Sequence, residues 1–313
     1  MPARPSVAGN FQLVLDGVVC GFLKSVDGGA AVADVVSETG SPTYFVKKHL
    51  GPLRYSQLAM QFGMAMSTDL FDWISASWKA NYMRKNGAVV AANQQFVAVS
   101  QREFFNALIT EVTVPKLDGS SKDPAYLTLK CAPEYTRSSK ASGNVTPIAK
   151  GDQKIWLPSN FRVTIDGLDC TKVRTVESFT VKQSVASDDI GDARNREKVP
   201  GRLEFPNLTI ALAESSAGSW FAWFEDFVIK GNCDDSKEKT GSIVFLAANR
   251  QDELLRIDLF NLGIFKLASD KRESNTGAVA TVTASLYCER MELHAPSSKP
   301  KTLPGVRGPR VRR

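Results

Sequence analysis

The side chains that could carry acid–base or metal chemistry in this chain are few and scattered. Its two histidines, His49 and His294, have no Cys, Asp or His beside them at the spacing of metal ligands or catalytic triads. The sequence also lacks a Gly-rich phosphate-binding loop and the H-E-x-x-H and G-x-S-x-G motifs. We therefore expect no catalytic residue, no cofactor, no metal site and no small-molecule substrate, and predict that the protein is not an enzyme.

Five cysteines form the second set of reactive side chains: Cys20, Cys131, Cys170, Cys233 and Cys288. Their number is odd and no C-x-x-C pair occurs, which disfavours both a disulfide framework and a zinc ribbon. Free, buried thiols in a reducing cytosol are the default expectation.

One acidic loop invites comparison with a cation site. Asp188, Asp189 and Asp192 lie close together, but the D-x-D-x-D-G order and the closing Glu of a calcium loop are missing. We expect instead a solvated loop that pairs with Arg194 and Arg196 or with a protein partner.

Basic residues give the chain a formal charge of +6 and a pI near 9.0, which favours nucleic-acid binding. The excess lies entirely in the last twenty residues, which contain no acid and carry Lys299, Lys301, Arg307, Arg310, Arg312 and Arg313. The rest holds 33 basic and 33 acidic residues and is neutral. We interpret residues 294–313 as an extended basic tail that tethers the protein to an acidic surface, with nucleic-acid binding through this tail as the alternative.

No segment has the pattern of a signal peptide or of a membrane span of about 20 apolar residues. The expected protein is soluble, is made without an export signal and has no membrane contact.

The most informative feature is an internal duplication with an offset of 150 residues. Residues 10–20 align without a gap on residues 160–170, with Asn, Phe, Asp, Gly and Cys identical. The match continues through residues 53–58 and 70–78, and near the end Leu127, Leu129 and Cys131 fall on Ala284, Leu286 and Cys288. That last match has an offset of 157, which we attribute to a longer loop at residues 269–276.

Each copy is expected to be mainly β with one helix. Strands are predicted at 10–15 and 160–165, where Asp-Gly then opens a hairpin. Further strands are predicted at 53–62, 95–100, 104–114 and 127–131, and at 203–212, 242–247, 254–265 and 279–292. In the last strand, residues 282, 284, 286 and 288 should face one side.

Between the predicted strands, Ser67 or Thr68 and Ser216 could cap amphipathic helices with apolar residues at 70, 71, 74 and 78 and at 220, 221, 224 and 228. Trp73, Trp78, Trp220 and Trp223 could stack on bases or sugars, but their helical spacing favours core packing.

Long, less apolar loops are expected at 28–51 and 184–201, and loops of this length are usually functional or mobile. The predicted organisation is a first domain at 8–137, a linker at 138–154, a second domain at 155–293 and the tail at 294–313.

Each copy resembles the tail tube protein family of contractile-tailed phages and contractile injection systems. The resemblance rests on the sequence of Asn160 to Gly167, on Val199-Pro200-Gly201 before a strand, on Trp223, and on the segments 242–246, 257–261 and 284–293. It implies two tandem β-sandwich or barrel domains, each with one packed helix, in rings of six domains around a channel. The long loops would contact neighbouring subunits, through Lys47 and Lys48 in the first copy and Asp188, Asp189, Asp192, Arg194 and Arg196 in the second.

The tandem copy departs from an ordinary tube subunit and suggests a tube-end or adaptor role. Three chains could supply six domains, or six chains could form two stacked rings. The implied partners are further copies of this chain and tail tube, sheath, spike or hub, or baseplate proteins. Assembly would take place in the bacterial cytoplasm, and the product would be part of a virion tail or an injection particle.

Overall fold

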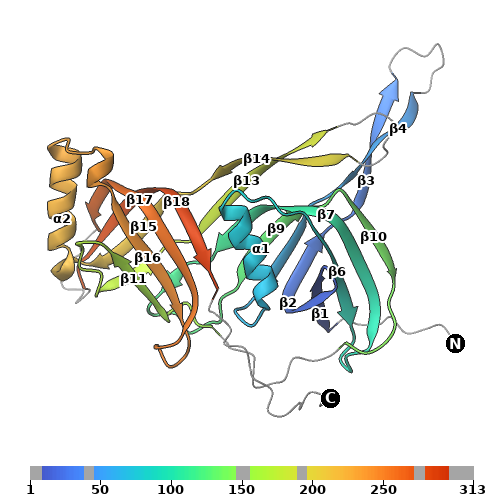
Figure 1. The fold of residues 1–313 in the computed structure, drawn as a ribbon, viewed down its shortest axis with the longest axis horizontal. Coiled ribbons are helices and arrows are strands. Elements are labelled where there is room, and N and C mark those ends of the chain that lie inside the picture. The colour runs from blue at the N-terminus through green and yellow to red at the C-terminus, as the bar shows by residue number, and fades with distance from the viewer. Residues whose placement is uncertain (1–8, 39–45, 146–155, 189–195, 271–278, 296–313) are drawn as a thin grey trace, which may run out of the picture.

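The first half of the chain forms a closed barrel, and the second half an open one beside it (Figure 1). The computed structural model describes residues 9–38, 46–145, 156–188, 196–270 and 279–295. Around the closed barrel the strands follow the order β1 (Asn10–Leu15), β2 (Val18–Gly28), β5 (Leu58–Phe62), β9 (Leu127–Ala132), β7 (Ala98–Val114) and β6 (Lys85–Ala92). Pairing of β7 with β9 and of β6 with β1 closes it.

The first barrel carries four further elements. Strands β3 (Ala31–Glu38) and β4 (Lys47–Tyr55) pair only with each other and form an arm, arm 1. Strand β10 (Tyr135–Lys140) continues β9 along β7, β8 (Leu117–Asp118) follows β7, and helix α1 is Thr68–Trp78.

The second half contains the sheet β11 (Phe161–Ile165), β16 (Lys239–Leu246), β17 (Glu253–Ser269), β18 (Thr281–His294), β15 (Leu208–Ala213) and β12 (Val173–Val176), in that order. Its arm, arm 2, is β13 (Phe179–Asp188) and β14 (Glu197–Glu204). The helical elements are η1 (Glu214–Ser216), α2 (Gly218–Phe224), η2 (Glu225–Ile229), which is π-helical, and η3 (Asp235–Lys237). The architecture confirms the predicted fold class of two tandem, mainly β domains.

The predicted hairpin forms in the first copy only. Asp16 and Gly17 have φ values of 45° and 84°, as a two-residue hairpin turn requires, and β1 pairs with β2. In the second copy β11 and β12 do not pair, so that prediction was wrong. Asp169 occupies the place of Val19, and its carboxylate accepts from the Thr171 amide at 3.0 Å and hydroxyl at 2.6 Å. This local turn competes with the strand and leaves the second barrel open.

The duplication is confirmed residue by residue in the strand registers. Leu23 pairs with Phe62 and Val26 with Met60, and 150 residues later Val173 pairs with Leu212 and Val176 with Ile210. Both pairs of strands have a register shift at the same place, after Leu23 and after Val173. The two copies therefore share their β-bulges as well as their strands.

The offset of 157 near the end of each copy was wrong. Ile109 pairs with Cys131 and Val112 with Leu129, while Ile264 pairs with Leu286 and Leu267 with Ala284, so the offset there is 155. The same offset relates Asn106 to Asn261, which both have positive φ. The extra residues consequently lie before β17, around η2 and η3, and not at residues 269–276; Cys131 corresponds to Leu286.

The helix prediction holds for the first copy and needs correction in the second. Leu70, Phe71, Ile74 and Trp78 are all buried on α1, although the Ser67 hydroxyl contacts Asp69 and caps no backbone amide. In the second copy Ser216 ends η1, and Ala217 is the residue that precedes α2. The buried residues there are Trp220, Trp223 and Phe227, whereas Phe221 and Val228 are exposed.

Several predicted boundaries also shift. Residues 28–51 and 184–201 are largely strands of the two arms and not loops, although the arm tips, 39–45 and 189–195, lie outside the described residues. The predicted strands at 53–62 and 203–212 are each divided in two, β7 begins at Ala98, and β6 was not predicted. Residues 138–140 of the predicted linker belong to β10, and 146–155 lie outside the described residues.

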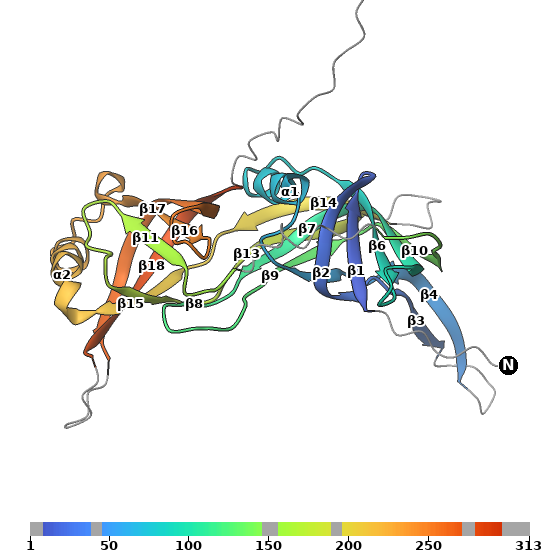
Figure 2. The ribbon, with the colours of Figure 1, turned by 90° about the horizontal axis from the view of Figure 1, so that it is seen from below.

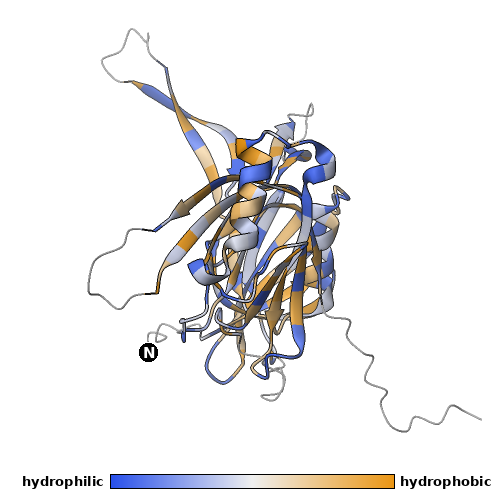
Figure 3. Ribbon diagram, turned by 90° about the vertical axis from the view of Figure 1, so that its left-hand side faces the viewer, coloured by the Kyte–Doolittle hydropathy of each residue, from blue (hydrophilic) through white to orange (hydrophobic). Residues whose placement is uncertain are grey.

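The core lies between the helices and the inner faces of the sheets, and apolar and polar residues alternate along the strands (Figure 3). Along β18, Val282, Ala284, Leu286 and Cys288 are buried and the residues between them are not, as predicted. All four helical tryptophans are buried, which confirms their assignment to the core: Trp73, Trp78, Trp220 and Trp223.

One pair of facing core positions exchanges its large and small residue between the copies. Leu108 faces Ala132 between β7 and β9, and the equivalent Gly263 faces Tyr287 between β17 and β18. A Cβ on Gly263 would lie 2.1 Å from the Tyr287 ring, whose hydroxyl donates to Glu238 at 2.6 Å. The ring therefore has little freedom to move aside.

We predict that Gly263→Ala destabilises the protein by about 1–3 kcal/mol, because the new methyl group overpacks this site. Urea-induced unfolding measures the change. In a Tyr287→Ala background the same substitution should cost far less, because the clashing ring is gone. Gly218→Ala is the matched control, since its Cβ would meet nothing within 4 Å. An equal cost of Gly263→Ala in both backgrounds would contradict the predicted clash.

Candidate functional site: the seam between the two domains

The two domains are joined by a continuous sheet. Phe179 to Lys182 of arm 2 pair with Val114 to Glu111 of β7, on the edge that β6 occupies further along the same strand. Arm 2 thus crosses from the second domain and covers the first (Figures 1 and 2). We call this pairing, with the contacts described below, the seam. An open strand edge would otherwise remain on the first barrel.

Polar contacts fix the register of the seam. The hydroxyl oxygens of Thr113 and Thr180 lie 2.9 Å apart across the two strands. At the next residue of β7, the Val114 carbonyl accepts a hydrogen bond of 2.9 Å from the Ser178 hydroxyl. Because each bond joins one residue of each domain, a slip of one position would break both.

A second strand pair crosses the seam next to the first. Leu117 and Asp118 of β8 pair with Val176 and Thr175 of β12, and the Gly119 amide donates to the Arg174 carbonyl at 2.9 Å. Leu117 is fully buried. Beside it, Lys116 and Glu177 form an ion pair of 2.7 Å, and the hydrogen bond to Glu177 raises the pKa of Lys116.

Helix α1 packs against the second domain. The Trp78 and Phe205 rings meet edge to face with centroids 6.3 Å apart, and Lys79 lies 3.3 Å from Glu292 on β18. Behind them the Ser77 hydroxyl donates to Gln183 Oε1 at 2.9 Å, and both residues are buried. The Gln183 amide nitrogen has no partner, so the bond from Ser77 is the one hydrogen bond that this side chain makes.

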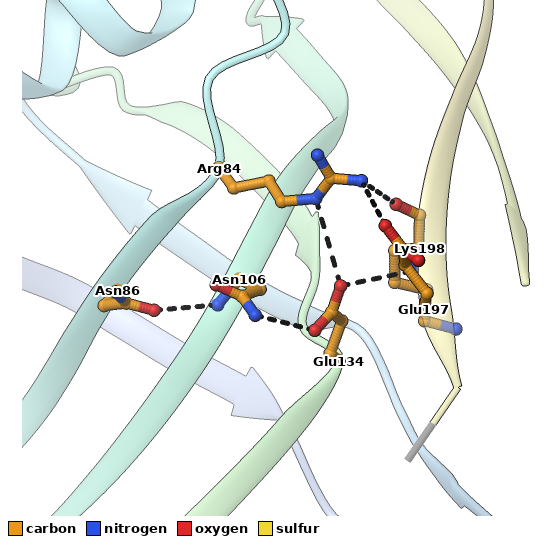
Figure 4. A network of polar contacts seen from close by, with 6 residues as sticks. All are labelled: Arg84, Asn86, Asn106, Glu134, Glu197 and Lys198. Carbon is orange, nitrogen blue, oxygen red and sulfur yellow. Dashed lines mark hydrogen bonds and ion pairs between the residues drawn. The ribbon is translucent and has the colours of Figure 1, made fainter. Parts of the chain in front are cut away.

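A polar network clamps the far part of arm 2 onto the first barrel (Figure 4). Arg84 donates to the Lys198 carbonyl at 2.8 Å and to the Glu197 carboxylate at 3.3 Å. Glu134 accepts from the Asn106 amide at 2.7 Å and from the Lys198 backbone at 3.4 Å. Burial, followed by the nearby Arg196, lowers the pKa of Lys198. Arm 2 is therefore held both at its base and at the outer end of its described strands.

The partner residues expected from the sequence lie on or near the arms. Asp188 is exposed at the end of β13, Arg196 directly precedes β14, and Lys47 and Lys48 are exposed on β4. Asp189, Asp192 and Arg194 lie outside the described residues, as do the tail residues Lys299, Lys301, Arg307, Arg310, Arg312 and Arg313. Asp188 pairs with Glu197, the residue after Arg196, so Asp188 and Arg196 lie near each other at the outer end of arm 2, while Lys47 and Lys48 lie on arm 1.

Sequence reasoning missed the residues that hold the seam. Arg84 and Glu134 lie in short connections with no motif. Gln183 carried a usable signal, because it continues the inward side of β13 after Phe179 and Val181. A polar residue at such a position calls for a buried partner.

The groups considered for chemistry are dispersed in the fold. His49 lies 2.8 Å from Glu38, and His294 lies 3.2 Å from Asp258. Burial raises the pKa of the Cys131 thiol to about 12, and Cys233 is the exposed cysteine. Within the described ranges no three His, Cys, Asp or Glu side chains are grouped as a metal site would need, and no helix is long and apolar enough to span a membrane.

Comparison with solved structures finds an extracellular contractile injection system, the anti-feeding prophage and Hcp1. One chain in the sheath–tube complex of an extracellular contractile injection system, PVC, is 17% identical to this chain. The match covers 43% of this chain and 88% of that chain, with a TM-score of 0.31. The tube-terminating cap of the anti-feeding prophage is 17% identical, with 50% and 95% covered and a TM-score of 0.33. Hcp1 from Flavobacterium johnsoniae is 13% identical, with 43% and 94% covered and a TM-score of 0.27. None of the curated proteins matches.

The decisive similarity is to a protein family. Its model, described as T4-like virus tail tube protein gp19, matches residues 7–137 and again residues 157–292. Tail tube proteins are structural components, so the match confirms the predicted structural and non-enzymatic role. The chain belongs to the T4-like virus tail tube protein gp19 family and carries two copies of its domain.

Proposed function

We propose that three copies of this chain form a closed ring of six tube-like domains at the end of a tail tube. The seam carries this proposal. It joins two family domains side by side through strand edges, which is the kind of contact that neighbouring domains within one ring would make. Two stacked rings would instead place the domains of one chain end on end.

The seam is also heterologous, which suits ring closure. Arm 2 is given by the second domain, and the edge of β7 and helix α1 receive it in the first. Such a head-to-tail contact, repeated with a constant rotation, closes into a ring. A ring of three such chains would have three-fold symmetry while presenting six tube-like domains. It could connect a three-fold spike or hub to a six-fold tube.

A ring at the end of a tail tube would contact several other components of the particle. The partners are further copies of this chain and tube, sheath, hub or baseplate proteins, and the particle is a virion tail or an injection system assembled in the bacterial cytoplasm. The domains extend over 8–137 and 155–293, with the loops at the arm tips and the basic tail contacting other components. The tail tethers the ring to an acidic protein surface.

A ring of three chains fixes the mass of the assembly. Native mass spectrometry of the purified protein should give three times the 34.2 kDa of one chain. Six chains would favour two stacked rings, and a protein that remains a monomer at high concentration would contradict a ring of either kind.

Ser77→Ala tests the contribution of the seam. The substitution leaves the buried Gln183 amide without its one partner, and we expect a loss of about 1–3 kcal/mol in the free energy of unfolding. Urea-induced unfolding measures it, with Ser75→Ala on the same helix as the control, expected within about 0.5 kcal/mol of the parent. Equal effects of the two variants would mean that the buried bond does not stabilise the seam.

Deletion of residues 296–313 separates the tether from the nucleic-acid alternative. It removes six cations and leaves the chain neutral. Any salt-dependent retention of the protein on duplex DNA should then disappear, because that binding depends on phosphate neutralisation. The three-chain mass should persist. DNA retention by the truncated protein at physiological salt would place a nucleic-acid surface on the folded domains.

A further inference from the structure

Several strand edges remain unpaired in the described part of the chain, among them those of β4, β10, β11 and β14. Two others are the equivalents of the two edges that meet at the seam. Strand β3 of arm 1 pairs only with β4, and the last part of β17, from Gly263 to Ser269, pairs only with β18. Arm 1 and helix α2 mark opposite ends of the molecule along its longest axis (Figure 1). Of these two edges, the one on β3 belongs to the first domain and the one on β17 to the second.

The free part of β17 is equivalent to the part of β7 that receives arm 2. Leu108 to Thr113 pair with β9 in the register that Gly263 to Ala268 adopt with β18, 155 residues later. Both strands have a register shift before the fourth of these residues. Glu111 to Val114 pair with β13, whereas their equivalents, Lys266 to Ser269, pair with no strand on that side.

Arm 1 is likewise equivalent to arm 2. Val32 pairs with Arg54 and Ala33 with Leu53, and at an offset of 150 Lys182 pairs with Glu204 and Gln183 with Leu203. The register shifts after Ala33 and after Gln183 also coincide. In arm 2 the outer edge of β13 is paired with β7, whereas the outer edge of β3 is free.

We propose that β3 of one chain adds to the free edge of β17 in a second copy of the chain, in the register of the seam. Ala31 then lies opposite Leu267 and Val32 opposite Lys266, as Val181 lies opposite Val112 and Lys182 opposite Glu111. The inference rests on the ring proposed above and specifies the contact between its chains.

The backbone polarity of both edges agrees with this register. Successive residues of a strand turn their N–H and C=O groups to opposite sides. The Ala30 N–H donates to the Ser56 hydroxyl, and the Ala30 carbonyl accepts from the Ser56 N–H. Both groups of Ala30 thus face β4, and those of Ala31 face outward. Asp270 donates to Thr281 on β18, so the groups of Ala268 also face β18 and those of Leu267 face the open side. Ala31 and Leu267 can therefore exchange two hydrogen bonds.

Residues near the free edge of β17 are more exposed than their equivalents on β7, where arm 2 is bound. Thr110 is 5% exposed under arm 2, whereas its equivalent Phe265 is 46% exposed. Val112 is 1% exposed, and its equivalent Leu267 is only partly buried. Phe265 and Leu267 therefore add apolar surface beside the free edge, which a second subunit would cover.

The helices show the same contrast. Trp78 is 3% exposed against Phe205 of the second domain, and its equivalent Val228 is 39% exposed. The counterpart of Phe205 on arm 1 is Tyr55. When arm 1 of the next chain lies on β17, Tyr55 comes to lie on Val228, and the apolar surface of both is buried.

The ion pair of the polar network in Figure 4 has equivalents of opposite sign at the proposed contact. Arg84 binds Glu197 across the seam, at 3.3 Å. Strands β6 and β16 are related by an offset of 154, because Leu13 pairs with Val89 and its equivalent Val163 with Ile243. Glu238 is thus equivalent to Arg84, and Lys47 to Glu197, so the proposed register would place an ion pair of reversed signs between the chains.

Disulfide cross-linking tests the register. Ala30 and Ala268 are equivalent to Thr180 and Thr113, whose hydroxyls are 2.9 Å apart, and a non-hydrogen-bonded pair of this kind has its Cα atoms about 4.5 Å apart, within disulfide range. In a Cys233→Ser background, oxidised Ala30→Cys with Ala268→Cys should form dimers and trimers on a non-reducing gel. Ala31→Cys with Ala268→Cys, slipped by one residue, should not.

Two further variants complete the test. Thr113→Cys with Thr180→Cys should form an intrachain disulfide and shows that the oxidation works at an observed seam. Lys47→Glu, at an exposed position, should raise the concentration at which the assembly dissociates by about two- to fivefold. A three-chain particle that cross-links only through the slipped pair, or through neither, would overturn the register and leave the ring intact. A protein that stays monomeric would overturn both.

Discussion

Unpaired strand edges are the constraint on which the rest of this structure depends. A sheet that ends in water leaves a row of backbone donors and acceptors open to chance pairing. The first domain closes its barrel by pairing β1 with β6, and it accepts arm 2 on the remaining part of β7. The second domain receives no such arm within the chain, and its sheet stays open between β11 and β12. The difference between the two copies is thus mainly a difference in which edges are already covered.

Much of this architecture could be predicted from local sequence, and the misses have identifiable causes. Alternation along β18 and the apolar positions of α1 are strong periodic signals, and both were predicted correctly. Strand β6 was missed because its Lys-Asn-Gly-Ala start and small residues resemble a loop. The absent hairpin in the second copy depends on Asp169, a single polar residue that favours a local turn. The seam could not be predicted, because the sequence of β13 indicates a strand but not which strand it pairs with.

Divergence of the two cores shows why the copies cannot be aligned reliably on residue type alone. The cysteines Cys131 and Cys288 suggested one alignment, and the strand registers show another, in which Cys131 corresponds to Leu286. Core positions are constrained by volume and not by identity. The exchange of Leu108 and Ala132 for Gly263 and Tyr287 keeps one large and one small residue at each crossing. The geometry of the bulges is retained while the residues that fill it change.

Covalent linkage gives the two kinds of domain contact different strengths. Within a chain, the tether keeps arm 2 at a high effective concentration near β7, so the seam forms without an encounter between molecules. A contact between arm 1 and β17 has no such advantage and must gain its stability from the surface it buries. The exposed Phe265, Phe221 and Val228 on the second domain provide apolar surface for that purpose, whereas their equivalents in the first domain, Thr110, Phe71 and Trp78, are buried. Duplication therefore allows one contact to be permanent and the other to depend on assembly, which a ring built from six identical single domains could not achieve.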